Sequence, residues 1–292
     1  MIAPKWMAAV IGAAMLFATG PDAQAQERVL EPLDEWNWGK TDEYCGLVRN
    51  FGDADSPVRM VIYSYGPTGS YRIMISGDDL PRNDEAAEQG SAAFGDVEDM
   101  QNIHMIVGKR GDGGEINFVV HRASGLHFVY AWSGESDTRG SIPLDPDATR
   151  VSFDTPEMEP VTLMLGSLES PLADLRACEQ ELMAGWQVDV VTPEAVATPA
   201  TIDNISVVAQ AIRRPPAMLV NRASQLMQLR LVIDAEGNAT DCVLQSPNWR
   251  DRDVRGVCTA FTGPGEYTAA RNAAGEAVPS LLRASYLMLI YD

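Results

Sequence analysis

Four cysteines carry the most distinctive chemistry of this chain: Cys45, Cys178, Cys242 and Cys258. None belongs to a Cys-x-x-Cys pair, which disfavours a structural zinc site and a thioredoxin-like redox site. In an oxidising compartment, cysteines of this kind form disulfides. Three pairings are possible, and we favour Cys45 with Cys178 and Cys242 with Cys258, because each bond then stays within one of two proposed domains.

Three histidines, His104, His121 and His127, lie in segments that we expect to be strands. His121 and His127 flank a turn at residues 123–125, so they could face each other as a cross-strand pair. A metal site would need a third ligand, which the sequence does not place. We predict no metal and no cofactor.

Other catalytic patterns are missing from the sequence. There is no Gly-x-Ser-x-Gly elbow for a serine nucleophile, and the glycine-rich stretch at residues 65–70 lacks the Gly-Lys-Ser/Thr ending of a phosphate loop. Scattered carboxylates are typical of a solvated surface. We therefore predict a protein that is not an enzyme. The alternative, an unrecognised acid–base site in the acidic part, would require a cleft with convergent carboxylates of perturbed pKa.

The charge is concentrated in the first two thirds of the chain. Residues 1–200 contain 13 Lys and Arg against 32 Asp and Glu, whereas residues 201–292 contain nine of each, so the whole net charge of −19 belongs to the first part. An acidic surface repels phosphate backbones, which argues against nucleic-acid binding.

The first 25 residues have the layout of a secretory signal peptide. Lys5 precedes an apolar run at residues 6–18, and the small-residue triplet at 23–25 predicts cleavage after Ala25. The run is shorter than the roughly 20 residues that span a bilayer. We expect a periplasmic protein with no membrane insertion of the mature chain. The alternative is an uncleaved segment that anchors the protein in the inner membrane.

The remaining chain reads as two domains of α+β class. Residues 26–187 predict a β-rich domain that ends in one helix at 170–186, where Leu172, Leu175, Cys178 and Leu182 recur at three- and four-residue steps. We expect its strands at 58–65, 71–76, 103–109, 116–122, 126–132 and 161–167, and an acidic loop or short helix at 78–99. Prolines among Ala, Thr and Val predict a linker at 188–210.

Residues 211–292 predict the order strand, strand, helix, strand. The first strand, QLMQLRLVID at residues 225–234, alternates apolar and polar residues, and Gly237 and Asn238 suit the turn that follows. A return strand at 239–246 precedes a helix at 250–261. The last strand covers residues 280–291.

This C-terminal part resembles the TonB C-terminal domain family. The motifs that carry the resemblance are Pro215-Pro216, Asp234-Ala235-Glu236-Gly237, Gln245-Ser246-Pro247, Tyr267-Thr268-Ala269-Ala270 and the loop from Gly275 to Pro279. Exported members of this type often have one cysteine on the return strand and one on the next helix, where Cys242 and Cys258 fall. The chain departs from the family at Ala269, where the pattern has proline, and lacks a long spacer: residues 188–203 reach only ~50 Å when extended.

The resemblance implies a non-catalytic protein that binds an extended peptide of an outer-membrane receptor or another envelope protein. If the last strand lies at a sheet edge, its free backbone groups can pair with such a peptide by strand addition. The residues predicted to contact the partner are Arg283, Ser285, Leu287 and Leu289. The alternative keeps the family's role in energy transduction for TonB-dependent transmembrane transport, with the amino-terminal segment retained as an anchor.

Overall fold

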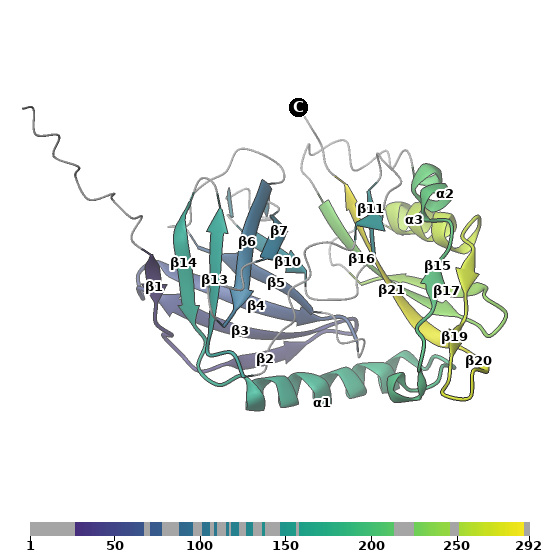
Figure 1. Cartoon of the computed structure of the whole chain (residues 1–292), viewed down its shortest axis with the longest axis horizontal. Coiled ribbons are helices and arrows are strands. Elements are labelled where there is room, and N and C mark those ends of the chain that lie inside the picture. Colours follow the sequence, from purple (N-terminus) through teal and green to yellow (C-terminus); the bar gives the residue numbers. More distant parts are fainter. Residues whose placement is uncertain are drawn as a thin grey trace, which may run out of the picture.

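The structure is a computed structural model with three β-sheets of five strands and three α-helices in its described part (Figure 1). It describes residues 27–66, 71–77, 88–95, 101–105, 108–109, 115–116, 118–122, 127–130, 136–137, 147–155, 158–212, 225–245 and 251–288. These residues contain two separate hydrophobic cores. One lies between the first two sheets, and the other lies on one face of the third sheet. The fold is of α+β class, as predicted. The predicted signal segment lies outside the described residues.

The first two sheets pack face to face as a sandwich. One has the strand order β1 (Arg28–Leu30), β14 (Met158–Met164), β13 (Arg150–Thr155), β6 (Glu88–Phe94), β7 (Gln101–Met105). The other has the order β10 (Phe118–Arg122), β5 (Tyr71–Ser76), β4 (Pro57–Ser64), β3 (Cys45–Gly52), β2 (Asn37–Lys40). Strand β3 alternates buried and half-buried residues along its whole length, because every second side chain points inward, and Cys45, Leu47 and Phe51 enter the common core. A short hairpin joins β8 (Gly108–Lys109) to β9 (Glu115–Ile116).

Helix α1 (Glu169–Trp186) closes one side of this core and runs along the base of the molecule toward the third sheet (Figure 1). Its apolar residues at three- and four-residue spacing are buried against the sandwich. The disulfide between Cys45 of β3 and Cys178 fixes the helix to the sheet, with the two Cα atoms 6.2 Å apart. Both the helix and this disulfide confirm the predictions from sequence.

The segment after α1 lies along the C-terminal part. It contains a 3₁₀ turn, η2 (Pro193–Ala195), and strand β15 (Thr201–Ile202), which pairs with β18 (Tyr267–Thr268). The amide of Ala197 donates to the carbonyl of Arg271, and the amide of Val191 to that of Pro279. Through these hydrogen bonds, the linker packs along the C-terminal part that contains the second core. Helix α2 (Ile205–Ala211) begins inside the predicted linker.

The third sheet has the order β12 (Ser136–Asp137), β11 (His127–Tyr130), β21 (Ser280–Met288), β16 (Gln225–Ile233), β17 (Ala239–Leu244). Helices α2 and α3 (Asp251–Thr262) supply apolar residues to the core on one face of this sheet. The remaining pair, β19 (Ala270–Arg271) and β20 (Ala277–Val278), forms a small hairpin. The strand, strand, helix, strand order predicted for residues 211–292 is observed in β16, β17, α3 and β21, and the short strands β18, β19 and β20 lie between α3 and β21.

The turn between β16 and β17 shows why a glycine stands at position 237. Gly237 has φ +83°, and a Cβ atom there would lie 2.5 Å from the carbonyl oxygen of Tyr267. The Asp234 carboxylate accepts hydrogen bonds from the amides of Glu236 and Asn238 and closes the turn. On the return strand, Cys242 forms the predicted disulfide with Cys258 of α3, with Cα atoms 5.6 Å apart.

Three expectations from sequence are corrected by the structure. Strand β6 lies inside the region 78–99 that was expected to be a loop or a short helix, because Ala92 and Phe94 enter the core. His121 and His127 do not form a cross-strand pair: β10 pairs with β5, whereas β11 pairs with β21. Strands β11 and β12, assigned to the first domain, belong to the sheet of the C-terminal part.

Candidate functional site

Two buried arginines lie opposite each other on the face of the third sheet that is turned away from α3. Arg230 of β16 is the direct cross-strand partner of Arg283 of β21, and each is 5% exposed. Their strand neighbours Leu229, Leu231 and Leu282 enter the second core on the other face. Like charges at directly opposed positions repel each other, so this pair requires partners from elsewhere in the chain.

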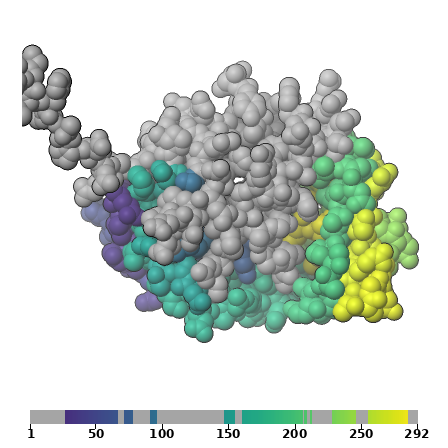
Figure 2. All heavy atoms as spheres, viewed as in Figure 1, coloured from purple at the N-terminus to yellow at the C-terminus, as the bar shows by residue number. Residues whose placement is uncertain are grey.

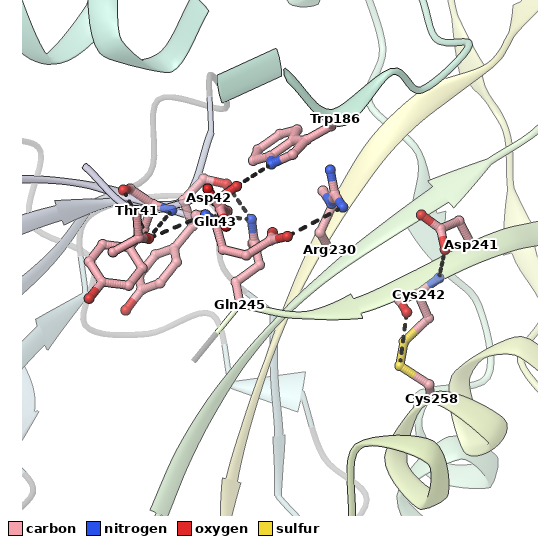
Figure 3. Close-up of polar contacts among 11 residues, drawn as sticks. Thr41, Asp42, Glu43, Trp186, Arg230, Asp241, Cys242, Gln245 and Cys258 are labelled. Atoms are coloured by element: carbon pink, nitrogen blue, oxygen red, sulfur yellow. Dashed lines mark hydrogen bonds and ion pairs between the residues drawn. A yellow bond between two sulfur atoms is a disulfide. The ribbon is translucent and has the colours of Figure 1, made fainter. Parts of the chain in front are cut away.

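The sandwich supplies those partners to Arg230. The guanidinium of Arg230 lies 4.1 Å from the ring centroid of Trp186, the last residue of α1, in a cation–π contact. One nitrogen of the guanidinium is 3.9 Å from a carboxylate oxygen of Glu43. The Trp186 indole donates to the carbonyl of Asp42 at 2.9 Å, so the same turn holds both the ring and the carboxylate in place (Figure 3).

Gln245 and Arg283 bind the sandwich through its backbone carbonyls. The Gln245 amide donates to the carbonyls of Glu43 at 3.1 Å and Tyr65 at 3.0 Å. Arg283 donates to the carbonyl of Gly66 at 3.2 Å and lies 5.6 Å from the Tyr65 ring centroid. We call the set Glu43, Tyr65, Gly66, Trp186, Arg230, Gln245 and Arg283 the polar joint.

Gly66 lies against the ring of Trp186, where only a glycine fits. Its φ is +124°, and a Cβ atom at this position would lie 2.8 Å from the Trp186 ring. Both the backbone conformation and the close approach therefore favour glycine. Beside it, the Ser64 hydroxyl donates to the buried carboxylate of Glu179 of α1. This contact ties the helix to the end of β4, which Tyr65 and Gly66 follow.

Burial controls the protonation of the charged groups. Burial raises the pKa of Glu43, and the nearby Arg230 partly opposes this rise. The pKa of Glu179 is raised by burial as well, against the opposing effect of its hydrogen bond from Ser64. Burial lowers the pKa of Arg230, and the nearby Glu43 opposes this fall. Burial also lowers the pKa of Arg283, to about 10, so Arg283 stays charged at neutral pH.

The described contacts of the polar joint join the sandwich to the third sheet. A carboxylate oxygen of Glu43, two guanidinium nitrogens of Arg230 and the amide oxygen of Gln245 are buried without a hydrogen-bond partner. Burying a polar group without a hydrogen bond costs free energy. The polar joint is therefore a polar contact, unlike the two apolar cores. Across the described residues, no group of three His, Cys, Asp or Glu side chains is placed to hold a metal ion.

The predicted partner-contact residues fall into three situations. Arg283 is buried and donates to Gly66, so its side chain faces the sandwich and not a surface. The backbones of Ser285 and Leu287 lie in β21 beside β11. Leu289 lies outside the described residues. The condition of a free sheet edge is not met over Ala284 to Leu287, because β11 pairs with these residues in parallel.

Sequence reasoning did not find Glu43, Trp186, Arg230 or Gln245. A signal was present in the second domain, where Arg230 and Arg283 both occupy the polar positions of strands with one buried face. The usual interpretation of such positions is a solvated face. Nothing local in the sequence indicates that the sandwich covers this face.

Comparison with protein-family models, with curated proteins and with solved structures finds no match to this chain.

Within the described residues, no helix has both the length and the apolar composition needed to cross a membrane. The two disulfides fit a protein of an extracytoplasmic compartment. In the space-filling view, β1 and the described residues after α3 occupy opposite ends of the molecule (Figure 2).

Proposed function

We propose that this is a non-catalytic binding protein of the periplasm whose C-terminal part is a TonB C-terminal-like domain. It binds an extended segment of an envelope protein, such as the amino-terminal segment of an outer-membrane receptor, by strand addition beside β21. The order β16, β17, α3, β21 supports the resemblance to that domain. The two disulfides support the compartment.

The observation that carries the proposal is the pairing of β11 with β21. Four residues from a distant part of the chain, His127–Tyr130, pair in parallel with Ala284 to Leu287. This side of β21 therefore accepts an extended segment through its backbone, which is how strand addition gives affinity. A partner segment would take the place of β11.

The register supports Ser285 and Leu287 as the proposed acceptor residues. The Gln245 amide donates to the carbonyl of Gln228, so the backbone groups of Gln228 point toward β17. Gln228 is also the cross-strand partner of Ser285. Hydrogen-bonded and non-bonded pairs alternate along an antiparallel ladder, so the backbone groups of Ser285 and Leu287 point away from β16 and toward β11.

The opposite edge of the sheet is less suited to strand addition. By the same alternation, the Cys242 amide of β17 points outward, and it donates to the neighbouring Asp241 carboxylate at 2.9 Å. The strand is also fixed to α3 by the disulfide. A negatively charged cap on the outward amide is one way to protect an edge strand.

The test compares peptide binding by the mature chain and by a Val129→Pro variant. Proline in β11 cannot donate a ladder hydrogen bond, so β11 should leave β21 and peptides from receptor amino termini should bind more tightly. Val119→Pro makes the same change in β10, which pairs with β5, and is the matched control. Equal affinities of the parent, Val129→Pro and Val119→Pro chains would refute strand addition beside β21.

A further inference from the structure

Strand β2 is an edge strand of its sheet, with α1 beside it and no described strand along its outer edge. It pairs with β3 and has no second partner among the described strands. All four of its residues are exposed, and Trp38 is 52% exposed. A Cβ atom added to Gly39 would meet no atom within 4 Å, so the neighbouring position of the strand is open as well.

The register shows which backbone groups of β2 are available. The amide of Thr41 donates to the carbonyl of Tyr44, which makes Thr41 and Tyr44 a hydrogen-bonded pair of the β2–β3 ladder. Alternation then directs the backbone of Gly39 toward β3. The amides and carbonyls of Trp38 and Lys40 point to the outer edge, where an added strand would pair with them.

The side chains of β2 do not protect this edge in the usual way. Edge strands are often guarded by a lysine that projects a free charge. Here the Lys40 ammonium forms an ion pair with Glu181 of α1, so part of its charge is neutralised. The other large side chain is Trp38, and exposed tryptophan is characteristic of the centres of protein interfaces.

The charge around β2 identifies the kind of partner. Glu35 precedes and Asp42 follows the strand in the chain, and both are exposed. Residues 1–200 carry the whole net charge of −19. This field attracts a positively charged segment and repels a second copy of the same acidic surface.

We propose that the β2 edge binds an extended, positively charged segment of a partner protein. The segment pairs with the outward amides and carbonyls of Trp38 and Lys40. One of its apolar side chains packs on the Trp38 ring, and its basic side chains lie near Glu35 and Asp42. This site is separate from the acceptor side of β21 and does not depend on it.

The test is isothermal titration of the mature full-length chain with a ten-residue peptide of alternating lysine and valine. Trp38→Ala should weaken binding about tenfold or more, as expected for an aromatic anchor at an interface. N-methylation of alternate peptide amides should abolish binding, because it removes the backbone donors and keeps the charge. Val207→Ala changes another exposed apolar residue, 42% exposed, and should have no effect.

Three results would overturn the proposal. One is failure of the parent chain to bind the lysine–valine peptide. Another is equal affinity of the Trp38→Ala variant or of the N-methylated peptide, which would indicate attraction to the acidic surface alone. The third is a dimer in sedimentation that Trp38→Ala dissociates, which would assign the edge to a second copy. The Val129→Pro variant should bind this peptide as the parent does, which separates this site from β21.

Discussion

Replacing Arg230 by methionine tests the role of the polar joint. The substitution keeps much of the side-chain length but removes the cation that faces Trp186 and Glu43. Glu43 would then remain in the joint with no cation beside it. We expect lower stability of the C-terminal part at neutral pH.

The size of the effect follows from the burial of the two partners. Loss of the cation–π contact is worth about 1 kcal/mol. Removing one partner of a fully buried ion pair costs about 3–5 kcal/mol, but the Glu43 side chain is 29% exposed and water can reach it. At a separation of 3.9 Å the pair is also not tightly closed. Together these terms predict a loss of about 2 kcal/mol.

The pKa of Glu43 determines how the stability loss of the Arg230→Met variant depends on pH. Burial raises the pKa of Glu43 above its ordinary value of 4.5, and Arg230 holds this rise back. Without Arg230 the pKa rises further, so the ionised carboxylate destabilises the variant above its folded-state pKa. Below pH 4.5 the carboxyl is protonated in both chains, and the difference in unfolding free energy should shrink.

The assay is urea unfolding at pH 7 and pH 4 with both disulfides intact, followed by tryptophan fluorescence. Arg255→Met alters an exposed arginine of α3 and should change stability by less than about 0.5 kcal/mol. A loss below about 0.5 kcal/mol for Arg230→Met, or the same loss at both pH values, would refute this account of the joint.

Three further predictions concern a disulfide, a turn and a half-buried tyrosine. Serine in place of both Cys242 and Cys258 should lower the unfolding free energy by about 3 kcal/mol, measured by urea unfolding; no change would contradict a stabilising bond. Gly237→Ala should lower it by about 2 kcal/mol or more and reduce the melting temperature, because φ is +83° and the new Cβ would strike the Tyr267 carbonyl. Burial raises the pKa of Tyr63 to about 12, so its contribution to stability should be lost as the pH rises from 10 to 12. Removal of that loss by Tyr63→Phe in alkaline unfolding would verify the assignment, and an unchanged loss would exclude it.

Local patterns were sufficient for some parts of the fold. The spacing of Leu172, Leu175, Cys178 and Leu182 predicted α1, since a helix repeats every 3.6 residues regardless of what covers it. Both disulfides followed from the choice of pairs within domains. Strands β16, β17 and β21 were predicted to within a few residues because each is bounded by a turn or a proline.

Long-range pairing was beyond the sequence. The segment that contains β11 was predicted to be a strand, but its neighbour in sequence, β10, pairs with β5, and β11 joins a sheet more than a hundred residues away. No local pattern encodes such a parallel pairing. The burial of Arg230 and Arg283 also depends on long-range packing, because the sandwich covers the face of the sheet that they occupy.

The most direct test of the proposed function is backbone NMR of the mature chain during titration with peptides from receptor amino termini. The account predicts that the amide signals of Ser285 and Leu287 shift and that the amides of β11 lose protection from hydrogen exchange as the peptide replaces that strand. Peptide binding that leaves both β21 and β11 unchanged would contradict strand addition at this side of the sheet.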